Sequence, residues 1–252
     1  MEKKIFIIGA SSGIGLELVK IWLENRYEVV ACSRGARENL ELVELKNKYN
    51  KKLNLLNIDV TDNMSVKNCV DEAFNIFKRY DICFFNAGVY ESMDINSIDI
   101  KNFEEMININ YLGAVRVLEN IIKYIKSKEK STRVVLNASI SSYFGLPYGG
   151  AYSASKAALV NFAQSIQPEL KKENIDLQII NHGFVKTRLT QKNDFEMPQL
   201  MDSKEAAEKI FINLNKPYRF EIKFPFILSN FLRLISLLPY SLSLFITKKF
   251  LK

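Results

Sequence analysis

Residues 5–15 read Ile5-Phe6-Ile7-Ile8-Gly9-Ala10-Ser11-Ser12-Gly13-Ile14-Gly15, an apolar run followed directly by a segment that contains three glycines. The apolar run predicts a buried strand, and the periodicity of residues 14–24 predicts a helix after it. Glycine permits a sharp turn and a close approach of phosphate, and the free N–H groups at a helix start attract anions. The stretch therefore predicts a turn that holds the pyrophosphate of a dinucleotide, with Ser11 and Ser12 as further donors. A plain glycine-rich turn is the alternative.

Strand-like and helical segments alternate along the chain. This alternation predicts an α/β fold of the Rossmann type, a doubly wound parallel sheet with helices on both faces. One domain is expected over residues 1–222, followed by an apolar, basic extension at 223–252. The predicted strands are Ile5–Ile8, Glu28–Ala31, Leu53–Ile58, Ile82–Phe85, Arg133–Asn137 and Leu177–Asn181, and the predicted helices are Ile14–Glu24, Ala36–Lys48, Met64–Lys78, Ile100–Ile125 and Ala151–Lys171.

The net charge of the 252-residue chain is +7, and its distribution is uneven. Five cations and no acidic residue lie in the last thirty residues, so most of the excess is in the extension. Nucleic-acid binding needs a basic face on the folded domain, and this distribution argues against it. The cysteines Cys32, Cys69 and Cys83 have no metal-ligand spacing. No metal site is expected, and their odd count predicts reduced thiols in a cytoplasmic protein.

The end of the second predicted strand bears on the choice of dinucleotide. An acid there would bind the ribose hydroxyls of NAD, and a basic residue would pair with the 2′-phosphate of NADP. The sequence reads Ala31-Cys32-Ser33-Arg34, with no acid before Glu38. A guanidinium group can bind phosphate bidentately, and Ser33 can donate to it. NADP(H) is therefore favoured over NAD(H), with a solvated surface arginine as the alternative.

A second motif concerns proton transfer. Tyr152 and Lys156 lie four residues apart in Tyr152-Ser153-Ala154-Ser155-Lys156, and Ser139 lies thirteen residues before Tyr152. Residues at this spacing share one face of a helix. We expect the ammonium group of Lys156 to lower the pKa of Tyr152, so that the tyrosine serves as general acid or base. An ordinary exposed helix pair is the alternative.

Further motifs occur in order along the chain. Asp59-Val60 follows the third strand, Asn86-Ala87-Gly88 the fourth, and Asn110 begins Asn110-Tyr111-Leu112-Gly113. With the glycine turn and the serine, tyrosine and lysine above, the chain resembles the short-chain dehydrogenase/reductase family of the compact single-domain type. The resemblance runs from about Lys4 to Thr187.

The resemblance implies a role for each matching residue. Ser139 would polarise a substrate carbonyl, Lys156 would also bond the nicotinamide ribose, and Asn110 would bind a water that replaces the spent proton. Asp59-Val60 would contact the adenine, and the Asn86 motif would steady the sheet beside the cofactor. The family commonly forms dimers or tetramers through the two long middle helices, so a homo-oligomer is expected. The implied cofactor contacts are Gly9, Ser11, Ser12, Gly13, Ile14, Gly15, Ser33, Arg34, Asp59, Val60, Asn86, Ala87, Gly88, Tyr152, Lys156, Gly183, Val185 and Thr187.

One loop departs from the family pattern. After the sixth strand the chain reads Asn181-His182-Gly183-Phe184-Val185-Lys186-Thr187, where His182 replaces the usual proline. It is either a tolerated loop substitution or a polar group that contacts substrate or titrates near neutrality. The residues expected to line a substrate pocket are Ser141, Tyr148, His182 and Phe184, with Ser142 and Tyr143 as further neighbours.

The segment that follows is expected to form a substrate lid. Residues 188–202 are rich in apolar side chains, which suits a cover over a hydrophobic substrate and would also suit packing against the body. Its apolar residues are Leu189, Phe195, Met197, Pro198, Leu200 and Met201.

The tail from Phe224 to Lys252 is rich in leucine and phenylalanine and carries several basic residues. Arg233 and Pro239 are expected to divide it into two pieces, each too short to span a bilayer. A segment lying on the inner surface of a membrane is one interpretation. A subunit interface, a cap on the substrate pocket and ordinary core packing are the others.

Together these features predict an NADP(H)-dependent oxidoreductase that interconverts a carbonyl and an alcohol on an apolar or lipid-like substrate. A non-redox isomerase, epimerase or dehydratase with bound cofactor is one alternative, and a non-catalytic cofactor-binding scaffold is the other.

Overall fold

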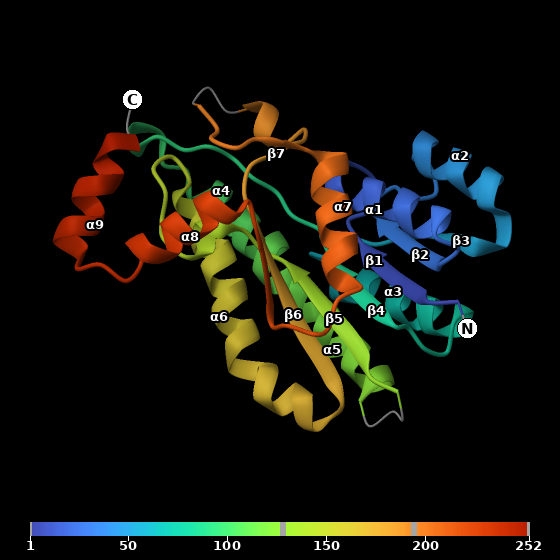
Figure 1. Ribbon diagram of the computed structural model, residues 1–252. Helices are drawn as coiled ribbons and strands as arrows, with labels where there is room; N and C mark the ends of the chain where they lie inside the picture. Colours follow the sequence, from blue (N-terminus) through green and yellow to red (C-terminus); the bar gives the residue numbers. More distant parts are fainter. Residues whose placement is uncertain (1, 127–129, 193–195, 251–252) are drawn as a thin grey trace.

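The computed structural model describes residues 2–126, 130–192 and 196–250. Phe195 of the expected lid and Lys252 of the tail lie outside the described residues. The centre of the fold is a seven-stranded parallel sheet of order β3-β2-β1-β4-β5-β6-β9 (Figure 1). Its strands are β1 (Lys4–Ile8), β2 (Glu28–Ser33), β3 (Leu53–Asn57), β4 (Ile82–Phe85), β5 (Thr132–Asn137), β6 (Ile175–His182) and β9 (Glu221–Phe224).

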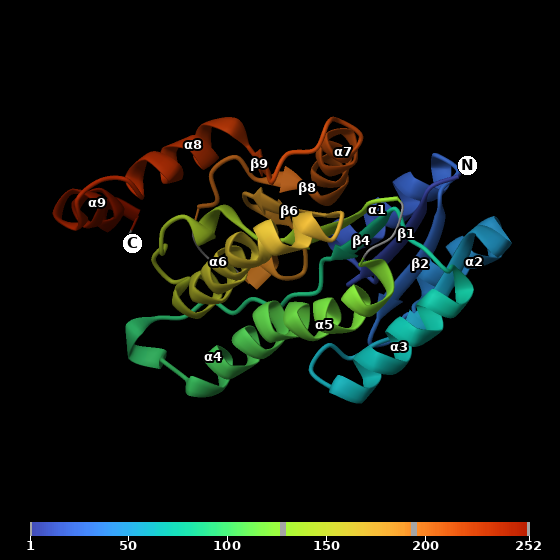
Figure 2. The same cartoon turned by 90° about the horizontal axis from the view of Figure 1, so that it is seen from below.

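Helices cover both faces of this sheet (Figure 2). Side chains alternate between the faces of a strand, so Phe6 and Ile8 pack on one face while Ile5 and Ile7 pack on the other. The first face is covered by α3 (Asn63–Ile76), α5 (Gly113–Ile125) and α6 (Gly150–Lys172). The second is covered by α1 (Gly13–Glu24), α2 (Leu40–Tyr49) and α7 (Ser203–Leu214). The prediction of a doubly wound Rossmann-type fold is confirmed.

The predicted helix Ile100–Ile125 is not continuous. It consists of α4 (Ile100–Met106), a π-helical segment (Ile107–Leu112) and α5. The wider turn places Asn110 against the loop after β4, where its side chain bonds the backbone of Val89. Interruptions of this kind are frequent at functional sites.

The predicted start of the second helix at Ala36 is also wrong. The helix begins at Leu40 because the side chain of Asn39 accepts a hydrogen bond from the Leu42 N–H at 3.0 Å and caps it there. Short 3₁₀ turns occur at Asn50–Lys52, Ile95–Ser97, Ile140–Ser142, Thr190–Lys192 and Lys248–Phe250.

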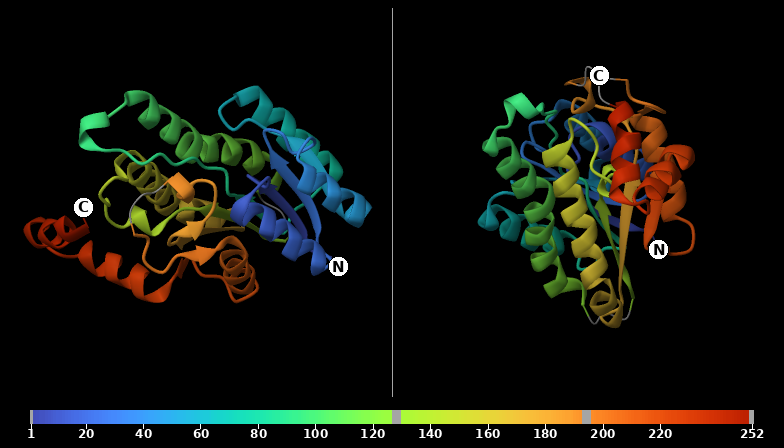
Figure 3. Two further views of the ribbon diagram at one scale, coloured as in Figure 1. Left: turned by 90° about the horizontal axis from the view of Figure 1, so that it is seen from above. Right: turned by 90° about the vertical axis from the view of Figure 1, so that its left-hand side faces the viewer.

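The chain after β6 contains elements that the sequence pattern did not predict. A small parallel pair joins β7 (Val185–Lys186) to β8 (Met201–Asp202), α7 follows, and β9 then adds the seventh strand beside β6. Strand β9 includes residues on both sides of the expected boundary at 222. The tail continues as α8 (Phe226–Ile235) and α9 (Tyr240–Thr247), which extend from one end of the sheet (Figures 1 and 3). Pro239 precedes α9, whereas Arg233 lies within α8 and does not interrupt it.

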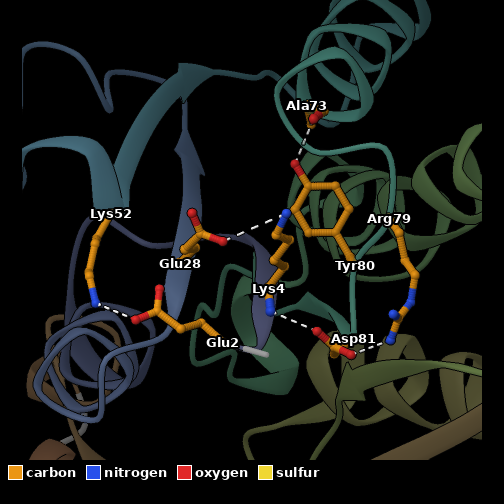
Figure 4. A network of polar contacts seen from close by, with 8 residues as sticks. All are labelled: Glu2, Lys4, Glu28, Lys52, Ala73, Arg79, Tyr80 and Asp81. Carbon is orange, nitrogen blue, oxygen red and sulfur yellow. Dashed lines mark hydrogen bonds and ion pairs between the residues drawn. The ribbon is translucent and has the colours of Figure 1, made fainter.

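A polar network closes the amino ends of the central strands (Figure 4). The Lys4 N–H donates to Asp81 at 2.8 Å, and Arg79 pairs with the same carboxylate. The fully buried Tyr80 donates its hydroxyl to the carbonyl of Ala73 at 2.6 Å. These contacts tie the amino ends of the central strands together, and the carboxyl ends of the strands are left for the site.

Candidate active site

A cleft of about 1430 Å³ lies at the carboxyl ends of the strands, the usual place for ligands in open α/β sheets. The structure brings together residues from the glycine turn, the ends of β2, β4, β5 and β6, and the start of α6. The predicted site residues line this cleft except Gly15, Asn110 and the further neighbours Ser142 and Tyr143. Gly15 and Asn110 lie behind the wall and shape it.

The glycine turn has the geometry that a phosphate cradle requires. Gly9 and Gly13 have positive φ angles of 90° and 55°, which favour glycine. A Cβ on Gly15 would lie 2.0 Å from the carbonyl oxygen of Gly9, so Gly15 permits the turn to pack on the helix. Ser12 forms the N-cap of α1 without bonding the helix through its side chain, among the residues described. The first N–H groups of α1 therefore stay available to an anion.

Two residues at the end of β2 fit a phosphate on the adenosine ribose. Arg34 is exposed, lines the cleft, and forms no hydrogen bond or ion pair with another described residue. The buried hydroxyl of Ser33 likewise lacks a partner within the described part of the chain. Glu38, the nearby acid, is instead bonded by the side-chain amide of Asn57 at 3.2 Å. The residues present thus fit a dinucleotide with a 2′-phosphate.

Asp59, which the resemblance places at the adenine, lines the same cleft. The N–H and hydroxyl of Thr61 donate to one oxygen of Asp59 at 2.9 Å and 2.7 Å. These bonds lower the pKa of Asp59, and Arg34 and Arg116 contribute by charge. The carboxylate is therefore ionised and oriented, and it can accept a hydrogen bond from an amino group. Val60 lines the cleft beside it.

Asn86 connects the cofactor turn to the catalytic side of the cleft. Its amide donates to the carbonyl of Gly9 at 2.7 Å, and the Asn137 amide donates to its oxygen at 2.8 Å. A Cβ on Gly88 would lie 3.2 Å from Asn110 Oδ1 and 3.7 Å from Lys156 Nζ. The Asn-Ala-Gly loop therefore fixes the distance between strands β1, β4 and β5 and leaves room for the lysine.

Tyr152, Ser139 and Lys156 meet at the centre of the cleft. Ser139 lies close enough to lower the pKa of the Tyr152 phenol, and the Lys156 ammonium lies 5.6 Å from the centre of the tyrosine ring. Tyr90, which the sequence analysis did not identify, packs edge-on against Tyr152 with ring centres 5.1 Å apart. This contact fixes the orientation of the phenol.

The prediction that Lys156 lowers the pKa of Tyr152 is wrong for this structure. Burial raises the pKa of Tyr152 to about 12, the nearby Ser139 hydroxyl acts in the opposite direction, and Tyr90 raises it further. Lys156 is only 4% exposed and donates to the carbonyl of Asn137 at 2.8 Å. Its own pKa is lowered by burial to about 8. Burial, which the sequence does not reveal, therefore dominates both groups.

Asn110 holds the loop after β4 in place. Its oxygen accepts from the Val89 N–H at 2.8 Å, and its amide donates to the Val89 carbonyl at 3.0 Å and to the Ser155 hydroxyl at 2.9 Å. The fully buried side chain thus ties the loop to the helix that carries Tyr152 and Lys156.

His182 does not titrate near neutrality. Burial lowers its pKa to about 4, the bond to Gly183 acts to raise it, and the charge of Lys156 lowers it. Its Nδ1 lies 2.7 Å from the carbonyl of Gly183, which can only accept, so the neutral ring carries its hydrogen on Nδ1. Of its two interpretations, that of a group titrating near neutrality is overturned. The ring nevertheless lines the cleft with Phe184.

The substrate side of the cleft combines hydroxyls with apolar side chains. The hydroxyls of Ser141 and Ser153 are buried and have no partner in the described ranges. Tyr148 lines the cleft, whereas Ser142 and Tyr143 do not. Of the expected lid, Leu189 and Pro198 line the cleft, while Met201 is buried in β8. Leu228, Phe231 and Leu232 of α8 complete the wall, so the tail takes part in the site.

Arg188 was also missed by the sequence analysis. Its guanidinium donates to the Ser12 hydroxyl at 3.0 Å, across the entrance to the glycine turn. Its position directly after Thr187 was the available signal, because the resemblance places that threonine at the cofactor. Arg188 can therefore reach an anion held at the start of α1.

Comparison with known proteins identifies the family of the chain. The sequence model for short chain dehydrogenases matches residues 3–197, so the chain belongs to the short-chain dehydrogenase family. An uncharacterized oxidoreductase of Schizosaccharomyces pombe is 30% identical over 75% of this chain, and the match spans 63% of that protein.

Solved structures have the same fold. A short chain dehydrogenase from Burkholderia cenocepacia in complex with NADP has a TM-score of 0.83 and 18% identity, with 97% of each chain covered. One from Burkholderia phymatum in complex with NAD has a TM-score of 0.81 and 18% identity, with 92% of each covered. The chain is thus an oxidoreductase of this family with a site for a nicotinamide dinucleotide.

Proposed function

We propose that the protein is an NADP(H)-dependent reductase that converts an apolar aldehyde or ketone to an alcohol, and that it catalyses the reverse oxidation. The observation that carries the proposal is the meeting of Ser139, Tyr152 and Lys156 in one cleft with the glycine turn. When bound, the cofactor supplies or accepts the hydride.

The protein's own part is to polarise the carbonyl and to move one proton. Ser139 would donate a hydrogen bond to the carbonyl oxygen, and Tyr152 would protonate that oxygen as negative charge develops on it. A tyrosine with a pKa of about 12 stays protonated at neutral pH, so the phenol holds the proton that reduction of the carbonyl requires. This supports reduction as the direction of the reaction. Lys156, whose ammonium donates to the carbonyl of Asn137, would also bond the ribose of the bound cofactor.

Preference for NADP(H) is supported by Arg34 and Ser33. Their side chains are available at the end of β2, while Glu38 is bonded by Asn57. Solved relatives bind either dinucleotide, as the two Burkholderia proteins illustrate, so the fold alone does not decide between them.

An apolar substrate is supported by the wall that α8 contributes. Leu228, Phe231 and Leu232 face the cleft together with Leu146 and Pro147. The hydroxyls of Ser141 and Ser153 lie buried in the same cleft and can bond polar atoms of the substrate. This combination suits a molecule with an apolar body and few polar atoms.

We further propose a cytoplasmic homo-oligomer. Three buried free cysteines support a reducing compartment. Exposed apolar side chains near α4, namely Ile95, Ile98 and Ile100, support an interface that includes this helix. Sedimentation of the purified protein would test it, and a monomer at micromolar concentration would contradict it.

The test is a titration of the purified protein with NADPH and NADH, followed by turnover of a panel of aldehydes and ketones. Tyr152→Phe should retain NADPH binding and lose at least roughly a hundredfold in turnover. Tyr143→Phe is the matched control, because Tyr143 lies outside the cleft and bonds Glu221. Product formation without net cofactor oxidation would instead support an isomerase, and full function in Tyr152→Phe would support a scaffold.

A further inference from the structure

The two C-terminal helices present an exposed apolar surface. Phe226, Leu237 and Tyr240 are each about four-fifths exposed, which is unusual for large side chains that cluster. We call this surface the docking face. It consists of Phe226, Ile227, Leu234, Leu237, Tyr240, Leu242, Leu244 and Phe245.

The opposite side of the same helices is packed on the body. Leu232 and Ile235 are 1% exposed and pack with Ile140, the residue that follows Ser139. Ile246 of α9 joins this cluster. One side of the tail therefore packs on the body and the other side is exposed. The exposed apolar residues belong to helices that are packed in place.

The tail that carries the docking face contributes positive charge and no acid. Lys248 and Lys249 are exposed at the end of α9, and residues 222–252 contain no acid. Arg233 lies 3.9 Å from Glu221 and over the ring of Tyr143, so it is partly engaged with the body. An apolar surface bordered by lysines complements a surface with apolar depth and anionic head groups.

The geometry allows this surface to lie on a bilayer and not to cross one. Helix α8 has 10 residues and α9 has 8, whereas a spanning helix needs about 20. None of the helices described is long and apolar enough to cross a membrane. The match to the short chain dehydrogenase sequence model ends at residue 197, before the tail begins.

A second copy of the chain fits the docking face less well. A two-fold interface places the same patch on both partners. The interface would then bring two copies of the basic tail together, with no acid in the tail to pair with Lys248 and Lys249. Like charges brought together in this way oppose association.

We propose that the docking face binds the surface of an anionic membrane and that the cleft takes its substrate from that side. Phe231 connects the two regions, because it lines the cleft and is also 41% exposed beside the docking face. The substrate part rests on the proposed reductase function, and the membrane part does not.

Vesicle co-sedimentation tests the membrane part. The intact protein should bind vesicles of phosphatidylcholine with phosphatidylglycerol. It should bind vesicles of pure phosphatidylcholine more weakly, and added salt should weaken its binding to the anionic vesicles. Leu234→Ser with Leu237→Ser should weaken binding by roughly tenfold or more for each side chain. Lys248→Glu should weaken it by roughly tenfold on anionic vesicles only.

Leu40→Ser is the matched control, since Leu40 is 80% exposed on α2, away from the tail. It should not change vesicle binding. Circular dichroism and NADPH affinity establish that the tail variants are folded. Folded protein that stays in the supernatant with anionic vesicles would overturn the proposal, as would a dimer without lipid that Leu234→Ser with Leu237→Ser converts to monomers.

The substrate part has its own measurement. On anionic vesicles, the intact protein should turn over a long-chain aldehyde dissolved in them at least roughly tenfold faster than the tail variants do. The vesicles should not change its rate with a short, water-soluble aldehyde. Equal rates for the intact protein and the tail variants on vesicles would overturn the substrate part of the proposal. Absence of turnover with either aldehyde would contradict the reductase function and leave the sedimentation result standing.

Discussion

Arg34→Ala should weaken NADPH binding much more than NADH binding. Arg34 is exposed at the end of β2 and makes no hydrogen bond or ion pair within the described part of the chain. Its removal therefore breaks no internal bond and should leave stability unchanged. Whatever affinity is lost comes from the ligand.

The magnitude follows from the contact that would be lost. Hydrogen bonds to a charged group contribute about 1.5–3 kcal/mol, which corresponds to roughly ten- to a hundredfold in the dissociation constant. NADH has no 2′-phosphate, so its affinity should change by less than about threefold. Added salt should reduce the difference, because the site is open to solvent.

Arg188→Ala provides the contrast. Arg188 bonds Ser12 at the glycine turn, where the pyrophosphate common to both dinucleotides would lie. Arg188→Ala should therefore weaken the binding of NADPH and of NADH by the same factor. The assay is a fluorescence titration of each variant with both reduced cofactors. An equal effect of Arg34→Ala on the two cofactors, or no effect on NADPH, would refute the assignment of the 2′-phosphate to Arg34.

Three further predictions concern stability and the glycine turn. The pKa of Lys156 falls from its ordinary 10.5 to about 8, so the unfolded chain binds the proton more tightly and stability is lost as pH falls from about 10.5 to about 8. At pH 7 Lys156→Met should therefore stabilise the cofactor-free protein by roughly 2 kcal/mol in urea unfolding while it abolishes turnover, and destabilisation would contradict the argument. Tyr80→Phe should lower the free energy of unfolding by about 1 kcal/mol and Tyr80→Ala by about 3–5 kcal/mol. Equal losses for the two variants would show that the packing of the ring does not contribute more than the hydroxyl hydrogen bond. Gly15→Ala should abolish dinucleotide binding because its Cβ would lie 2.0 Å from Gly9 O, whereas Gly145→Ala, with no atom within 4 Å, should be neutral in the same titration.

The parts of the site that the sequence predicted are local in the chain. The glycine turn, Tyr152 with Lys156, and the Asn86 loop each follow from a few adjacent residues and from the strand or helix beside them. A parallel sheet then brings their strand ends to one edge. The cleft therefore contains nearly all of the predicted residues.

The parts that were missed depend on contacts between distant segments. Tyr90 meets Tyr152, Arg188 meets Ser12, and α8 packs on the residue after Ser139. The interruption at Asn110 also depends on a distant partner, Val89. Spacing along the chain does not encode such contacts.

The protonation predictions failed for the same physical reason. The proximity of Lys156 to Tyr152 was correctly inferred, but its effect depends on how deeply each group is buried. Burial raises the pKa of Tyr152, which opposes the expectation from sequence, and lowers that of His182, which opposes one of the two interpretations of this residue. Desolvation depends on the complete fold.

Hydride transfer itself tests the central claim most directly. The measurement is mass spectrometry of the alcohol formed from an apolar aldehyde with NADPH deuterated at the transferred position. The account predicts one deuterium in each alcohol molecule, with the rate reduced at least roughly a hundredfold in Tyr152→Phe and NADPH affinity retained. Product without deuterium, or an undiminished rate in Tyr152→Phe, would contradict it.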